Sequence, residues 1–153
     1  MYKTHLTFAL FLGLLFLPFM NEKILFLPIV LICALLPDID SMHSILGKHW
    51  FFRPLQWVVK HRGMLHSLTL AIIIALLVSF VFPVIAFPFF LGYVSHLLGD
   101  AMTEEGIRPW WPFKKEVEGF FRTGGRVEKW IFWILVIVCV FLVVKLLKSR
   151  ALF

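Results

Sequence analysis

Two short stretches place ionisable side chains at the ends of apolar runs. In "SHLLGD", His96 and Asp100 are four residues apart, so a continuous helix puts both on one face with Cβ atoms about 5 to 6 Å apart. In "LPDIDS", Asp38 and Asp40 are two residues apart, and an extended backbone would point them to opposite sides. One carboxylate would then bind a cation while the other bridges a second ion or orients a histidine. Either stretch alone is also compatible with ordinary hydrogen bonds or a solvated helix end.

A third stretch, "HRGMLHS", carries two imidazoles five residues apart. One helical face does not hold both, so we expect His61 in a turn that Gly63 permits and His66 at the start of the next helix. Ser67 is interpreted as a helix cap, because no activating base stands beside it in the sequence. Arg62 either binds a phosphate or a carboxylate through its two parallel donors, or extends to water along the membrane surface.

Together these stretches predict a site for one or two divalent ions, zinc or manganese, because their ligands are imidazole nitrogens and carboxylate oxygens. Two such ions about 3.5 to 4 Å apart polarise a phosphoryl or carbonyl oxygen and activate water, which is the chemistry of hydrolysis. His5 adds a further imidazole, although a residue at the membrane edge is an equally good interpretation of it. The predicted metal ligands are His5, Asp38, Asp40, His61, His66, His96 and Asp100.

The remaining histidines and the cysteines are assigned no chemistry. His43 and His49 lack a partner at ligand spacing and are interpreted as loop residues. Cys33 and Cys139 both lie inside apolar runs, so we predict neither a disulfide nor a thiolate metal site.

The elements that must position these residues are membrane helices. The chain has 153 residues, of which 61% are hydrophobic and 17% aromatic, far from the composition of soluble domains. Its apolar stretches show no alternation of the kind that barrel strands require. We therefore predict an all-α, polytopic membrane helix bundle with about five transmembrane or membrane-embedded helices, in the ranges 6–20, 24–37, 65–82, 84–99 and 130–144.

Prolines and polar turns separate these helices. Pro18, Pro37 and Pro83 mark boundaries, whereas Pro28 and Pro88 are predicted to lie in first helical turns, where proline is tolerated. No linker or internal repeat divides the chain, so residues 1–153 are expected to form one membrane-embedded domain. The first apolar run lacks a small-residue cleavage site and is expected to be retained.

The charges predict how the bundle lies in the membrane. Alternating the five spans places the amino terminus and the long loops 38–64 and 100–129 on one side, with eleven Lys and Arg residues against four on the other. By the positive-inside rule that side is cytoplasmic, in a plasma or inner membrane. The net charge of +6 is then a topology signal and an attraction for anionic lipids, and no nucleic-acid motif accompanies it. All the candidate ligands fall on this side.

Both long loops also carry aromatic residues beside basic ones. "HWFFRPLQWVVK" and "RPWWPF" are typical of interfacial segments, since tryptophan and phenylalanine settle at headgroup depth while arginine and lysine reach water. Membrane lipids are therefore the expected surroundings of the site.

In these stretches the sequence resembles the YdjM-like family of inner-membrane proteins, described as predicted metal-dependent hydrolases. The family pattern of an early histidine, LPDIDS, an HRGxTHS-type block and a GxxSHxxxDxxTxxG block corresponds to "TH", "LPDIDS", "HRGMLHS" and "GYVSHLLGDAMTEEG" here. The resemblance covers most of the chain and implies the ligand set above, with Arg62, Thr103 and Gly106. Leu65 stands where many relatives have threonine. A remoter similarity of ligand pattern, to zinc-dependent phospholipases C, favours phosphoesters.

The leading hypothesis is a membrane-bound, metal-dependent hydrolase acting on a phosphoester or lipid-linked substrate at the cytoplasmic surface. Arg62 would stabilise the anionic transition state, and Glu104 or Glu105 would carry a proton if their loop folds back over the site. Two alternatives remain open. One is an ion or proton transporter, although transport sites usually lie near the bilayer midplane. The other is a non-catalytic protein with a structural metal site, although seven candidate ligands exceed the four of a closed site.

Overall fold

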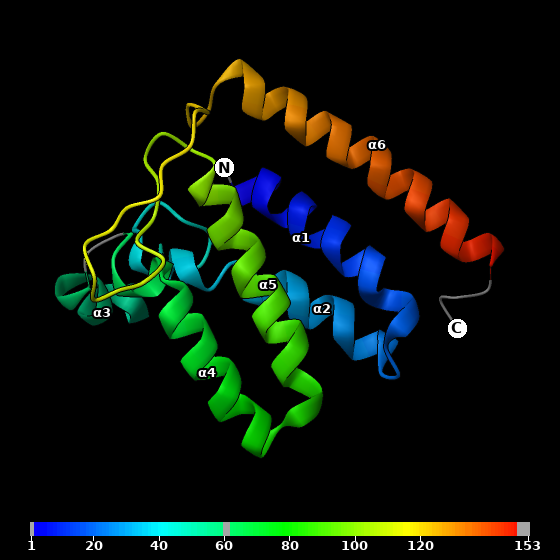
Figure 1. The fold of residues 1–153 in the computed structure, drawn as a ribbon, viewed down its shortest axis with the longest axis horizontal. Helices are drawn as coiled ribbons and strands as arrows, with labels where there is room; N and C mark the ends of the chain where they lie inside the picture. The colour runs from blue at the N-terminus through cyan, green and yellow to red at the C-terminus, as the bar shows by residue number, and fades with distance from the viewer. Residues whose placement is uncertain (1, 60–61, 150–153) are drawn as a thin grey trace.

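The protein, seen here as a computed structural model that describes residues 2–59 and 62–149, is built from helices (Figure 1). The described part of the chain contains no β-strand, only two isolated bridges. The α-helices are α1 (Tyr2–Phe16), α2 (Lys23–Cys33), α3 (Arg53–Val58), α4 (Leu68–Val81), α5 (Pro83–Ala101) and α6 (Arg126–Lys148). Four short 3-10 helices lie between them, η1 (Leu17–Phe19), η2 (Pro37–Asp40), η3 (Trp50–Phe52) and η4 (Met64–His66).

Each of the five predicted apolar stretches overlaps one of the helices α1, α2, α4, α5 and α6, so the predicted all-α membrane bundle is confirmed. Within the part of the chain that the structure describes, three segments are long and apolar enough to cross a membrane: Tyr2–Phe19, Pro83–Ala101 and Arg126–Lys148. The other two are shorter. At 1.5 Å per residue, α2 is about 16 Å long and α4 about 21 Å, less than a hydrocarbon core of about 30 Å.

Helix α5 is the centre of the bundle and packs against α1, α2 and α4 (Figure 1). Ala9, Leu14 and Val30 form one core between α1 and α2, and Ala71 and Tyr93 belong to a second between α4 and α5. Helix α6 lies along the outside of α1 and buries little more than Cys139 and Leu146. Between the charged residues at its two ends its exposed side chains are apolar, for example Trp133, Ile137 and Phe141, as expected of a helix that faces lipid.

The prediction that Pro28 and Pro88 lie in first turns is wrong. Helix α2 begins at Lys23 and α5 at Pro83, so each proline falls inside its helix. Proline costs little only in the first turn, where the backbone N–H has no helical partner. Further along it removes one helical hydrogen bond, which membrane helices tolerate when neighbouring helices support the backbone. Pro88 is itself buried against such neighbours.

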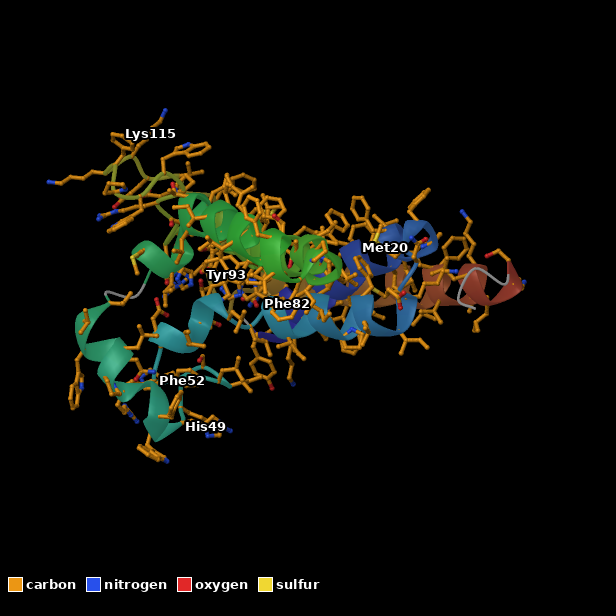
Figure 2. All side chains as sticks on the ribbon, turned by 90° about the horizontal axis from the view of Figure 1, so that it is seen from below. Met20, His49, Phe52, Phe82, Tyr93 and Lys115 are labelled. Atoms are coloured by element: carbon orange, nitrogen blue, oxygen red, sulfur yellow. The ribbon has the colours of Figure 1, made fainter. Side chains whose placement is uncertain are left out.

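Both long loops lie at one end of the bundle, beside the start of α1, as the alternating topology predicts. Figure 2 shows His49 and Phe52 of the first loop and Lys115 of the second at this end, with Met20 nearer the other. Trp50, Phe51, Trp57 and Phe113 are all largely exposed here, which fits the interfacial role predicted for these segments.

The second loop folds back toward the bundle. Ile107 and Val117 exchange two backbone hydrogen bonds, and Gly119 N–H donates to the carbonyl of Thr103 over 2.9 Å. Gly106 has φ +58°, a conformation that glycine adopts at no steric cost. The loop therefore has a defined shape that holds residues 103–107 beside the end of α5.

The close approach of α2 and α5 requires the glycine at position 92. A Cβ atom there would lie 2.2 Å from the carbonyl oxygen of Val30, so a methyl group forces the two helices apart. We expect Gly92→Ala to lower the free energy of unfolding by about 1 to 3 kcal/mol, measured by denaturant titration in detergent. Leu98→Ala, on the exposed side of the same helix, is the control and should cost less. Equal stability of Gly92→Ala and the wild type would contradict this packing.

Candidate metal centre

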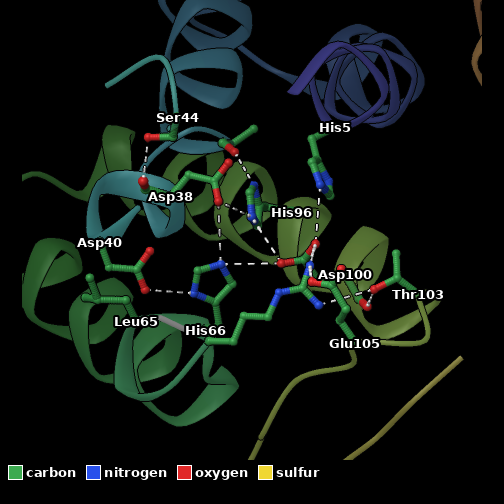
Figure 3. Close-up of polar contacts among 12 residues, drawn as sticks. His5, Asp38, Asp40, Ser44, Leu65, His66, His96, Asp100, Thr103 and Glu105 are labelled. Carbon is green, nitrogen blue, oxygen red and sulfur yellow. Dashed lines mark hydrogen bonds and ion pairs between the residues drawn. The ribbon is translucent and has the colours of Figure 1, made fainter. Parts of the chain in front are cut away.

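Four side chains bring two imidazole nitrogens and two carboxylate oxygens together at the loop end of the bundle (Figure 3). His66 Nε2 lies 3.7 Å from Asp38 Oδ1 and 3.3 Å from Asp100 Oδ2. His96 Nε2 lies 3.6 Å and 3.5 Å from the same two oxygens. A zinc ion bound at about 2.05 Å holds tetrahedral ligands about 3.3 Å apart. The four spacings are close to that value and exceed the usual 2.7 to 3.2 Å of an N–H···O hydrogen bond.

The hydrogen bond of His96 Nδ1 orients the ring and shows which nitrogen faces the carboxylates. His96 Nδ1 lies 2.8 Å from the carbonyl oxygen of Ala34, which can only accept, so Nδ1 carries the proton. If the ring carries no second proton, as metal binding requires, Nε2 presents a lone pair to two carboxylates. It is buried, and within residues 2–59 and 62–149 no group forms a hydrogen bond with it. Facing lone pairs repel, and a cation between them removes the repulsion.

Asp40 contacts the outer nitrogen of His66, as the carbonyl of Ala34 does for His96. Its Oδ2 lies 3.3 Å from His66 Nδ1, on the side of the ring away from Asp38 and Asp100. A carboxylate on the outer nitrogen of a metal-binding histidine orients the ring and increases its basicity. The expected extended backbone of "PDID" is wrong, because Pro37–Asp40 forms the 3-10 helix η2. The two carboxylates nevertheless point to different partners, as the spacing led us to expect.

His5 joins the cluster from the first turns of α1. Its Nε2 lies 3.4 Å from Asp100 Oδ1, and its ring stacks on that of His96 with centroids 4.2 Å apart. Gly99 makes room for it, since a Cβ atom there would lie 2.5 Å from His5 Nδ1. His5, His96 and Asp100 form one potential ligand group, and Asp38, His66 and His96 form another. His96 has only Nε2 left to bind an ion, but Asp100 presents one oxygen to His5 and the other to His66 and His96, so it could bridge two adjacent ions.

Local sequence explains how these side chains are held. The four-residue spacing in α5 puts His96 and Asp100 on one face, as predicted. Ser67 caps α4, accepting from Leu70 N–H at 3.2 Å and donating to the carbonyl of Met64 at 2.7 Å, so its predicted role is confirmed. This cap fixes the start of α4 immediately after His66.

Arg62, rather than Gly63, makes the left-handed turn before η4, with φ +60°. Such a backbone costs a residue other than glycine about 1 to 2 kcal/mol. The guanidinium contacts Asp100 Oδ1 at 3.3 Å and the carbonyl of Gly106 at 3.2 Å. It also lies 3.3 Å from Thr103 Oγ1. These contacts hold the residue in its strained conformation.

The two glutamates predicted to carry a proton differ in position. The loop folds back and brings Glu105 Oε2 to 3.2 Å from Arg62 Nη2, while the Glu105 side chain remains exposed. Glu104 is exposed too, and its side chain contacts no member of the cluster in the part of the chain that the structure describes. His61, the remaining predicted ligand, lies outside the described residues. His43 and His49 are exposed loop residues, as predicted.

Charge is unbalanced at this site. Asp40 and Asp100 are 5% and 2% exposed, and Asp38 is largely buried, so three carboxylates lie out of water. Among the described residues, Arg62 is the permanent cation in contact with them. Buried charges are costly unless they are compensated. A divalent cation with Arg62 would bring the three carboxylates to neutrality.

The proton is the other cation that the site attracts. Burial by itself lowers the pKa of His66, but the carboxylates of Asp38, Asp40 and Asp100 outweigh it and raise the pKa to about 9. Burial would raise the pKa of Asp38, yet its contacts with His66 and His96 hold that pKa below its usual value. Without a metal, His66 is therefore an imidazolium at neutral pH.

Sequence reasoning missed the carbonyl of Ala34 and the hydroxyl of Tyr93, which donates to the carbonyl of Leu65 and so supports η4. A backbone carbonyl leaves no mark in a sequence. Tyr93 precedes His96 by three residues, and a tyrosine inside a buried apolar helix is a signal that its hydroxyl needs a partner.

Fold and site together define a helical membrane protein with a buried His–Asp cluster that can hold a divalent cation. The chain belongs to the YdjM inner membrane protein family, which it matches over residues 1–152. It is 36% identical to the inner membrane protein YdjM of Escherichia coli K12 over 56% of this chain and 48% of that protein. The Shigella flexneri protein of the same name gives the same values. The chain thus spans about half the length of these relatives, and no solved structure matches it.

Removal of a ligand provides the first test of the cluster. We expect Asp38→Ala and His96→Ala each to weaken metal binding by more than about 100-fold, because loss of a direct ligand costs more than the 10- to 100-fold typical of its supporting partners. Membrane insertion should be unchanged. Metal content of the purified variants checks this, with His43→Ala, an exposed loop histidine, as the control. Normal metal content in both variants would disprove the ligand assignment.

Metal affinity should rise with pH. The metal needs the lone pair of His66, whose proton in the metal-free protein leaves only around pH 9. Below that pH one proton is displaced per binding event, so we expect affinity to increase by about tenfold per pH unit from pH 6.5 and to level off near pH 9. Competition against a zinc chelator at several pH values measures this. A metal affinity that does not vary between pH 6.5 and pH 9 would show that metal binding displaces no proton from His66.

Proposed function

We propose that this membrane protein is a metal-dependent hydrolase that acts on a phosphoester or lipid-linked substrate at the cytoplasmic membrane surface. The observation that carries the proposal is the arrangement of His66 and His96, whose Nε2 atoms both face the carboxylates of Asp38 and Asp100 at 3.3 to 3.7 Å. A divalent ion bound by these nitrogens and oxygens would stabilise the arrangement, and the ligand types are those of zinc or manganese.

The chain's own residues would divide the work as follows. His66, His96, Asp38, Asp100 and His5 would hold one or two ions, with His61 a further candidate ligand. Asp40, which lies behind His66, would position that ring instead of binding metal. A divalent ion bound here supplies a Lewis acid and makes water nucleophilic near neutral pH.

Arg62 and Glu105 would complete the machinery at the edge of the cluster. Both line a pocket of about 160 Å³ that also includes Arg108 and Glu116. The guanidinium of Arg62, next to Asp100, is placed to stabilise negative charge on a reacting phosphoryl group. Glu105 is exposed and contacts Arg62, so it can exchange a proton with water. We assign the proton transfer to Glu105 in preference to Glu104, which does not line this pocket.

The position of the His–Asp cluster at helix ends argues against an ion or proton transporter, and its adjoining pocket argues against a structural metal site. His5 lies in the first turns of α1 and Asp100 next to the last residue of α5, so the cluster is at helix ends, while transport sites usually lie at the bilayer midplane. A closed structural site would not need an adjoining polar pocket. Both observations favour chemistry at the membrane surface.

The direct test is hydrolysis in lipid nanodiscs. Protein loaded with zinc or manganese should release phosphate from phosphatidic acid or from a soluble aryl phosphate, and chelation should abolish the release. Asp100→Asn should be inactive and His49→Ala should be active. Metal-dependent ion flux in proteoliposomes, with no hydrolysis of any phosphoester, would favour the transporter instead.

Asp40 provides a separate prediction, because it touches the site only through His66. Asp40→Asn keeps the size of the side chain but removes the negative charge behind the ring. We expect metal affinity and hydrolysis to fall by about 10- to 100-fold, the usual effect of losing such a partner. Chelator competition and the phosphate-release assay measure the two effects. An unchanged affinity would remove Asp40 from the site.

A further inference from the structure

A second cavity adjoins the cluster and is lined by different residues from the Arg62 pocket. It lies between α1, the end of α5 and α6, has a volume of about 150 Å³ and is lined almost wholly by apolar atoms. His5 and Thr103 form its inner end, and Phe8, Ile131 and Leu135 belong to its apolar wall. We call it the α1–α6 crevice.

The crevice reaches the cluster through Asp100. His5, which lines the crevice, lies 3.4 Å from Asp100 Oδ1, and Arg62, which lines the polar pocket, lies 3.3 Å from the same oxygen. Thr103 lines the crevice and contacts Arg62. The candidate metal centre therefore stands between an apolar cavity and a polar one.

The apolar cavity has a defined location in the membrane. Helix α1 together with η1 is long and apolar enough to span a membrane, as is α6, and α6 lies along α1 on the outside of the bundle (Figure 1). Ile131 and Leu135 are one to three turns inside α6, toward the hydrocarbon. Thr4 Oγ1 donates to Glu128 Oε1 at 2.7 Å, and this bond connects α1 to the start of α6. Gly124 N–H, in the loop before α6, donates to Glu128 Oε2 at 2.6 Å and holds the carboxylate in place.

We infer that the α1–α6 crevice binds the first part of a hydrocarbon chain of a membrane lipid whose phosphoester lies at the His–Asp cluster. This inference rests on the proposed hydrolase function and narrows its substrate class to a lipid phosphoester. An apolar cavity of about 150 Å³ takes a guest the size of benzene, which is comparable to a short length of chain. The rest of the chain stays in the bilayer beside α6. A soluble phosphoester has nothing to place in this cavity.

Photolabelling tests the location of the chain without requiring turnover. The probe is phosphatidic acid with a diazirine in its acyl chain, in phosphatidylcholine vesicles that contain the protein, and mass spectrometry maps the labelled residues. We expect Ile131 and Leu135 to be labelled above Ile137, which is exposed on the same helix. Excess unlabelled phosphatidic acid should remove this surplus, and glycerol phosphate should not. Equal labelling of the three positions would overturn the inference.

Two matched variants separate blocking from misfolding. Ile131→Trp should fill the crevice, abolish the surplus label at Leu135 and stop hydrolysis of phosphatidic acid, while metal content and hydrolysis of a soluble aryl phosphate are retained. Ile137→Trp, the same change on the exposed face, should behave as the wild type. Surplus label that persists in Ile131→Trp would overturn the inference, as would equal loss of both substrates at normal metal content. If Ile131→Trp loses its metal, the same measurements are made on Leu135→Trp, which fills the crevice further from the cluster, and the same outcomes apply to label at Ile131.

Failure of the two proposals gives different results. Metal-dependent hydrolysis of the soluble phosphoester without surplus labelling would support the proposed hydrolase function and refute lipid binding in the α1–α6 crevice. Surplus labelling without hydrolysis of any phosphoester would refute the proposed hydrolase function. The lipid bound in the crevice would then not be a substrate.

Discussion

The structure depends on cationic compensation of carboxylates buried at one end of a membrane bundle. Asp38 and Asp100 both face the Nε2 lone pair of His96, because its other nitrogen donates to the carbonyl of Ala34. A proton or a metal ion on Nε2 turns that contact into an attraction. The carboxyl ends of α2 and α5 add the negative ends of two helix dipoles nearby. A bound cation offsets all of these terms at once.

The rest of the fold can be understood as the support of that site. The close packing of α2 on α5 through Gly92 brings "PDID" to His96, and the cap at Ser67 brings His66 to the same place. Gly99 lets α1 deliver His5. The folded loop after α5 brings Glu105 to Arg62, which contacts Asp100 of the cluster. Since these parts come from distant segments, the site forms only when the bundle is assembled.

Much of this could be predicted from the sequence, because the signals are local. Hydropathy located the five helices, the four-residue spacing located the His96–Asp100 face, and the even number of crossings between motifs put every ligand at one end. Local signals also misled. Pro28 and Pro88 were assigned to first turns because helix starts are poorly marked in apolar sequence, and "PDID" was expected to be extended although a proline at its start is equally suited to a 3-10 turn. The bond from His96 to Ala34 and the crevice beside His5 depend on tertiary packing, which no local pattern encodes.

The most direct measurement is the metal content of the wild-type protein, purified from membranes without chelator or added metal and analysed by inductively coupled plasma mass spectrometry. We predict about one or two equivalents of zinc or manganese per chain, as one- or two-ion sites require. Metal at the background level of Asp38→Ala, in protein that remains folded, would contradict the account.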